Sequence, residues 1–175
     1  MIFHFKQWLS CLKQYLLICL FISGPERLSY SLHCILFSLL AYSLLGFSLV
    51  DEQRSYAIAL AQIFLELGLL ALVAHVGLKW KKKQSRFHQT FSALVGVNLV
   101  ISAVSIPVYQ VLSQNIGAGG GIDQAVLNAT LLVVFWNLAV LSLIFKRAFE
   151  INTVLAAMIS FNYFLLYQFI IVWFL

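Results

Sequence analysis

Charged residues are scarce in this sequence. Only 10% of its 175 residues are Asp, Glu, Lys or Arg, and 62% are hydrophobic. Soluble domains carry about 25% charged residues. A large buried core does not explain this composition, because a chain of this length has too much surface for its volume. The composition therefore excludes a soluble globular domain and predicts an all-α, polytopic helix bundle embedded in a membrane.

Proline and cysteine are also rare. Of the two prolines, Pro25 suits the first turn of a helix, and Pro107 is expected to kink the span that contains it. The three cysteines, Cys11, Cys19 and Cys34, show no Cys-x-x-Cys or His-paired spacing. Each lies in an apolar stretch, so we expect each to act as a small hydrophobic side chain.

Catalytic and metal-binding motifs are missing as well. The four histidines are scattered, and none is paired with a carboxylate or a cysteine at metal-ligand spacing. The nucleophile elbow, the zinc-protease motif and the dinucleotide fingerprint do not occur. The glycine run 117–121 lacks the Lys and Ser/Thr of a phosphate-binding loop, so it is interpreted as a linker. We therefore predict no enzyme activity, no metal and no cofactor.

Long apolar runs dominate what is present, and a membrane-spanning helix needs about 20 such residues. The predicted spans cover about 28–50, 56–78, 88–112, 124–145 and 152–174. Residues 1–22 differ, because polar side chains recur there at spacings of three and four and the apolar run 15–22 is too short to span. We predict an interfacial amphipathic helix over 1–22, retained in the protein, and a five-span bundle over 23–175. Asp123 is the expected N-cap of the fourth span.

The positive charges predict an orientation. Ten of the eleven Lys and Arg residues fall on one side of the predicted spans, and only Arg54 falls on the other. This excess indicates that the N-terminus and the loop 79–86 are cytoplasmic and that the C-terminus lies on the opposite side, with a bacterial inner membrane as the expected location. Nucleic acid is not an expected partner of the net +5 charge, because the cations sit beside apolar runs.

The loop 79–86 is the candidate contact site for anionic lipid headgroups or for a cytoplasmic partner. Its candidate residues are Lys79, Trp80, Lys81, Lys82, Lys83 and Arg86. Trp80 is expected to anchor the loop at the membrane interface.

Glu66 is the one acidic residue near the middle of a predicted span, and Gln62 shares its helix face. An ionised carboxylate at that depth costs several kcal/mol, so a functional role is the first hypothesis to consider. The candidate polar site comprises Gln62, Glu66, Asn98, Ser102, Asn137 and Asn162. In the last span, Ser160, Tyr163 and Tyr167 share one face.

Two interpretations of the candidate site are open. These residues line a polar path or bind a coupling proton, or they are interhelical hydrogen-bonding groups that keep Glu66 neutral. Transporters usually show paired charges or broken helices in repeated halves, and neither pattern is evident here. The sequence alone therefore favours the structural interpretation.

Three short segments resemble the bacterial branch of the YIP family of small five-span membrane proteins. They are Arg86-Phe-His-Gln-Thr-Phe-Ser-Ala-Leu-Val-Gly, Gly24-Pro-Glu-Arg and Trp136-Asn-Leu. The resemblance implies a five-span bundle with a cytoplasmic N-terminus. It implies no known chemistry and no active-site residue.

From the sequence we expect a non-enzymatic integral membrane protein that acts as a scaffold or accessory subunit in a membrane complex or in envelope organisation. Its partners would be membrane lipid and other membrane proteins or further copies of itself. Small residues four apart, Ser92 with Gly96 and Ala125 with Ala129, favour close helix approach. The alternative is a small transporter or channel component with a proton- or ion-linked Glu66.

Overall fold

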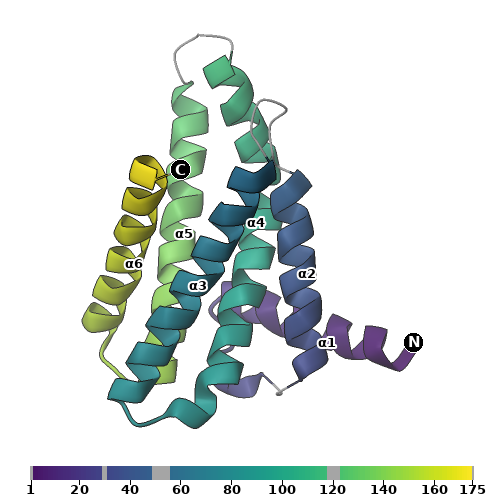
Figure 1. Cartoon of the computed structure of the whole chain (residues 1–175), viewed down its shortest axis with the longest axis vertical. Coiled ribbons are helices and arrows are strands. Elements are labelled where there is room, and N and C mark those ends of the chain that lie inside the picture. The colour runs from purple at the N-terminus through teal and green to yellow at the C-terminus, as the bar shows by residue number, and fades with distance from the viewer. Residues whose placement is uncertain (1, 29–30, 49–55, 118–122, 175) are drawn as a thin grey trace.

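The computed structural model describes residues 2–28, 31–48, 56–117 and 123–174, and over these residues every regular element is a helix (Figure 1). The α-helices are α1 Ile2–Cys19, α2 Leu32–Ser48, α3 Tyr56–Trp80, α4 Phe87–Gly117, α5 Gln124–Phe149 and α6 Thr153–Phe174. Two short 3-10 helices, Pro25–Arg27 and Gln84–Arg86, precede α2 and α4. The prediction of an all-α chain is confirmed.

Four stretches within the described residues are long and apolar enough to cross a membrane. They are Tyr56–Trp80, Gln84–Leu112, Gln124–Phe149 and Thr153–Trp173. The predicted span 28–50 corresponds to α2, which has only 17 residues and therefore extends about 26 Å, less than the roughly 30 Å of a bilayer core. Parts of that predicted span, residues 29–30 and 49–50, lie outside the described residues. The bundle is compatible with a membrane protein, and the count of five spans stays a prediction.

Helix α1 lies across the lower end of the bundle (Figure 1). The sequence predicted a helix lying in the plane of the interface, but the second half of α1 packs inside the protein. Cys11, Tyr15, Ile18 and Cys19 are buried in the same core as residues of α4 and α5. This half of α1 is therefore part of the packed bundle, and the interfacial position of the helix stays a prediction.

Tyr15 explains why α1 enters the core. Its ring lies against Gly96 of α4, where an added Cβ would come within 2.4 Å of the ring carbons. Its hydroxyl is 2.9 Å from the Ser92 hydroxyl and accepts a hydrogen bond from Ser38 at 3.3 Å. The space that Ser92 and Gly96 leave on α4 is therefore filled by an aromatic ring of α1.

Cysteine chemistry differs from the expectation. Cys11 of α1 and Cys34 of α2 form a disulfide with a Cα–Cα distance of 6.5 Å, so they are not separate small hydrophobic side chains. Cys19 is free and buried, as expected. No spacing pattern marks this pair in the sequence, because the two cysteines lie on different helices.

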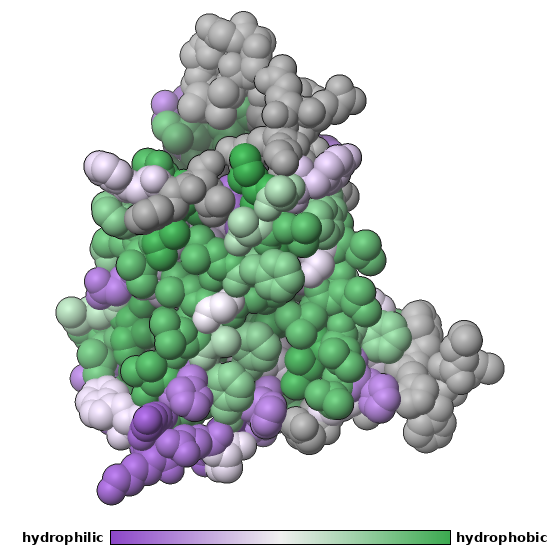
Figure 2. All heavy atoms as spheres, in the orientation of Figure 1, coloured by the Kyte–Doolittle hydropathy of each residue, from purple (hydrophilic) through white to green (hydrophobic). Residues whose placement is uncertain are grey.

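The charged loops gather at one end of the molecule. Arg147 binds Glu26 at 2.5 Å, and Arg86 binds Glu150 at 2.9 Å. These pairs bring the 3-10 helix before α2, the loop between α3 and α4 and the turn between α5 and α6 together. Figure 2 shows the hydrophilic side chains at this lower end beneath a broad apolar belt. We call it the charged end.

The segments that carry the resemblance to the YIP family contact other parts of the chain. The Gln89 amide donates to the carbonyl oxygens of Glu26 at 3.0 Å and Leu28 at 2.8 Å. The Trp136 indole donates to the carbonyl oxygen of Cys19, the last residue of α1, at 2.9 Å. Both side chains therefore fix the N-terminal segment to the bundle.

The predictions for the N-cap of α5 and for the two prolines can be compared directly with the structure. The Asp123 side chain accepts a hydrogen bond from the Ala125 N–H at 3.1 Å, so the predicted N-cap of α5 is confirmed. Pro25 starts a helix as predicted, although this helix is only the 3-10 turn before α2. Pro107 lies inside α4, which continues past it to Gly117.

Candidate polar site inside the helix bundle

Glu66 of α3 is held by tyrosines from two other helices. The Tyr42 hydroxyl of α2 donates to the Glu66 carboxylate at 2.5 Å, and the Tyr167 hydroxyl of α6 lies 3.4 Å from the same oxygen. The sequence places no Lys or Arg in α2, α4 or α6, and none in α3 before its last turn. Hydroxyl donors therefore take the place that a cation would occupy beside a buried acid.

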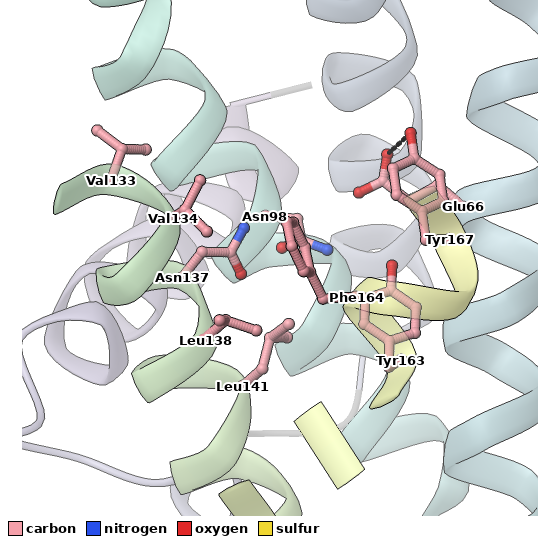
Figure 3. Close-up of a pocket in the computed structure, with 10 residues that line it drawn as sticks. All are labelled: Glu66, Asn98, Val133, Val134, Asn137, Leu138, Leu141, Tyr163, Phe164 and Tyr167. Atoms are coloured by element: carbon pink, nitrogen blue, oxygen red, sulfur yellow. Dashed lines mark hydrogen bonds between the residues drawn. The ribbon is translucent and has the colours of Figure 1, made fainter. Parts of the chain in front are cut away.

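A first cavity, of about 130 Å³, lies among α3, α4, α5 and α6 (Figure 3). Its polar lining consists of Glu66, Asn98, Asn137, Tyr163 and Tyr167. Figure 3 shows the Asn98 and Asn137 amides pointing toward one another from α4 and α5. Asn98 is only 3% exposed, and the side-chain oxygens of both asparagines are buried without a hydrogen-bond partner. Unsatisfied buried acceptors are uncommon and call for a physical explanation.

A second cavity, of about 360 Å³, lies on the other side of Glu66. Its polar lining consists of Tyr42, Gln62, Glu66, Ser102, Tyr109, Tyr167 and Gln168. Helix α3 runs toward the charged end, and Gln62 precedes Glu66 in it, so this cavity lies farther from that end. Helix α4 runs away from the charged end, and Ser102 follows Asn98, which gives the same order. Glu66 and Tyr167 line both cavities.

Five of the six predicted polar residues therefore line one or both cavities. Asn98 and Asn137 line the first, Gln62 and Ser102 line the second, and Glu66 lines both. The structure does not bring Asn162 to this group. Its side chain is exposed, and its amide donates to the Met158 carbonyl oxygen one turn earlier, at 2.8 Å.

Helix rotation explains the place of Asn162. Neighbouring helix positions differ by about 100°, and the adjacent Tyr163 is buried at 6% exposure and takes the inward position. Depth in the span alone had suggested Asn162, although the shared face of Tyr163 and Tyr167 had already been recognised in the sequence. The helix face that Tyr163 and Tyr167 share was therefore a better indicator of the site than depth in the span.

Sequence reasoning did not select Tyr42, Tyr109 or Gln168. Tyr42 is the most important of these, since it is buried at 7% exposure and makes the shortest hydrogen bond to Glu66. One signal was present in the sequence. An acid in a chain without Lys or Arg at its depth needs O–H donors, and tyrosine supplies a long one.

The five cations of the loop between α3 and α4 fall into three groups. Lys83 and Arg86 both bind Glu150, and these contacts lower the pKa of its carboxyl, the Lys83 hydrogen bond most and that of Arg86 next. Lys81 places its ammonium 4.6 Å from the centre of the Trp80 ring, and Trp80 is 64% exposed. Lys79 and Lys82 are exposed, and the ion pairs found among the described residues do not include them.

No group of three or more His, Cys, Asp or Glu side chains in the described residues is arranged to hold a metal ion. Comparison of the chain with protein-family models, with curated proteins and with solved structures finds no match. The resemblance to the YIP family is therefore untested and stays a prediction. The site has to be interpreted from its own chemistry.

Proposed function

We propose that this chain is an integral membrane protein that passes a proton or a small cation through its helix bundle, as a small transporter or a channel component. The observation that carries the proposal is the position of Glu66 and Tyr167, which line two cavities at once. A carboxylate between two cavities can accept a proton from one side and release it to the other.

The cavities favour transport over a purely structural role for Glu66. If Glu66 only held helices together, the side chains around it should be closely packed, because protein interiors contain few voids larger than a water molecule. Here the acid is bordered by space on both sides, and two amide oxygens in the first cavity lack partners. The sequence alone favoured a scaffold or accessory subunit because it showed no paired charges. That role stays a prediction, and the paired cavities now support the transport alternative more strongly.

The proposal includes an orientation. The charged end holds the loop between α3 and α4 and the turn between α5 and α6, so the excess of Lys and Arg assigns it to the cytoplasmic side of a bacterial inner membrane. Between the first cavity and the charged end, α3, α4 and α5 pack a fully buried apolar layer that includes Leu78, Leu94 and Phe145. We take this layer as the closed side of the path in the present conformation.

The test is proton flux in liposomes. Purified protein is reconstituted, a potassium-diffusion potential is applied, and acidification is followed with a trapped pH dye. Glu66→Gln keeps the shape and hydrogen-bonding capacity of the side chain but cannot carry the proton as a carboxylate does, so flux is expected to fall at least about tenfold.

Asp123→Asn is the matched control. It is the same acid-to-amide change, it lies at the start of α5 away from both cavities, and asparagine also caps helices well. Its flux is expected to equal that of the unmodified protein. Equal flux in the Glu66→Gln protein, with normal reconstitution, would remove Glu66 as the carrier of the proton.

A further inference from the structure

We infer that the first cavity binds a small organic ammonium ion, with Asn98, Asn137 and Glu66 as its hydrogen-bond acceptors. This inference rests on the proposed function and names the class of solute that the same site takes.

The unpaired atoms require a donor. Asn98 and Asn137 line the cavity, and their side-chain oxygens are buried and lack hydrogen-bond partners. The remaining charge in the lining is the acid Glu66, and α4 and α6 contain no Lys or Arg that would attract an anion. A ligand that satisfies these groups must donate hydrogen bonds and carry a positive charge rather than a negative one.

The walls favour an organic cation over a metal ion. Tyr163, Phe164 and Tyr167 contribute three aromatic rings, and the Tyr163 and Tyr167 rings are stacked with centroids 6.4 Å apart. Aromatic faces attract ammonium groups that have lost their water. Calcium takes six to eight oxygen ligands and magnesium needs a near-octahedral set. The rest of this lining is Val and Leu, which suits the alkyl part of an organic ammonium ion.

The volume limits the ligand. The cavity of about 130 Å³ is slightly smaller than the 150 Å³ cavity, known from protein engineering, that accepts benzene. A ligand of roughly four to six heavy atoms therefore fits. Propylammonium and butylammonium are suitable probes, and bulkier quaternary ammonium ions are expected to be excluded.

The experiment measures binding to the purified, detergent-solubilised protein by isothermal titration and by the shift in melting temperature. Propylammonium chloride is compared with propanol, sodium propionate and sodium chloride at equal ionic strength. Propylammonium alone is expected to bind and to raise the melting temperature. Equal binding of propanol would overturn the inference by showing a merely apolar cavity, and equal stabilisation by sodium chloride would overturn it in favour of a metal cation.

Two variants and one control locate the site. Asn137→Leu removes one acceptor, and Glu66→Gln removes the charge, so each is expected to weaken propylammonium binding at least about tenfold. Asn162→Leu is the matched control, because Asn162 is exposed outside both cavities and its loss leaves binding unchanged. If Asn137→Leu yields no folded protein, Glu66→Gln decides alone. Unchanged affinity in the folded variants would place the ligand elsewhere and refute the inference.

The flux assay separates this inference from the proposed function. Flux that depends on Glu66, together with no propylammonium binding, would refute the ammonium site and leave proton transfer standing. Propylammonium binding that depends on Asn137, together with no flux of protons or of the amine, would keep the ammonium site and refute transport.

Discussion

Glu150 is the residue that ties the loop between α3 and α4 to the end of α5. It caps α5 in the left-handed backbone region, with φ of 52°, a conformation that glycine adopts more easily than any other residue. Its carboxylate binds both Lys83 and Arg86. A non-glycine residue at this position costs about 1 kcal/mol of backbone strain. The contacts of the Glu150 carboxylate with two cations explain why a glutamate is found there.

We predict that Glu150 makes stability depend on pH. Its pKa is lowered in the folded protein, so its contribution is present above the unfolded value of about 4.3 and is lost as the pH falls through the folded value. The melting temperature of Glu150→Gln should lie below that of the unmodified protein near neutral pH. That difference should close as the pH falls below about 4.

Salt provides the control for the Glu150 prediction. The pair is exposed, so about 1 M sodium chloride at neutral pH should also narrow the difference between the two proteins. A difference in melting temperature that is independent of both pH and salt would show that the backbone conformation, and not the ion pair, is responsible.

The position of helix α1 depends on a surface of α4 that carries only small side chains. Gly96 leaves room for the Tyr15 ring, and Ser92 one turn earlier supplies a hydrogen-bond partner for the Tyr15 hydroxyl. The disulfide between Cys11 and Cys34 and the hydrogen bond from Trp136 to the Cys19 carbonyl hold the same helix at two further points. These contacts make α1 part of the bundle rather than an attached surface helix.

We predict that Gly96→Ala destabilises the protein by about 1–3 kcal/mol, because the new methyl group would overlap the Tyr15 ring. The measurement is the melting temperature in detergent. Gly68→Ala in α3 is the matched control. Apart from the adjoining backbone of α3, no atom lies within 4 Å of its added Cβ, and alanine has a higher helix propensity than glycine. Equal melting temperatures for the two variants would contradict the described packing of α1.

Over the whole molecule, the charged end and the apolar belt define how the protein would sit in a bilayer. Within the loop between α3 and α4, Lys83 and Arg86 are engaged with Glu150, whereas Lys79 and Lys82 are exposed. The sequence treated all these cations as equivalent candidates for lipid contact. The structure separates them into a pair that holds the loop and a pair that can meet anionic headgroups.

We predict that Lys79→Gln with Lys82→Gln lowers the amount of anionic lipid that co-purifies with the protein, without changing its melting temperature. Lys83→Gln with Arg86→Gln removes the same number of charges and should do the opposite, lowering the melting temperature while leaving the lipid bound. Lipid is measured by mass spectrometry of the purified protein. Equal lipid loss in both double variants would mean that net charge alone recruits the lipid.

The sequence determined the class of protein and the places of its helices. Helices α3 to α6, the N-cap Asp123 and the clustering of Lys and Arg follow from the lengths of apolar runs, from capping rules and from charge, which are all local properties. Glu66 was found in the same way, because an acid in an apolar run is conspicuous whatever surrounds it.

Only the tertiary structure shows which faces of the helices pack against one another. Lipid and protein interior are both apolar, so hydropathy does not reveal which side of a membrane helix points inward. For that reason the sequence grouped Asn162 with the polar site, did not show that α1 packs against α4, and did not pair Cys11 with Cys34. The tyrosines around Glu66 and the two cavities that they border depend on the rotation and pairing of five helices, and no single segment contains that information.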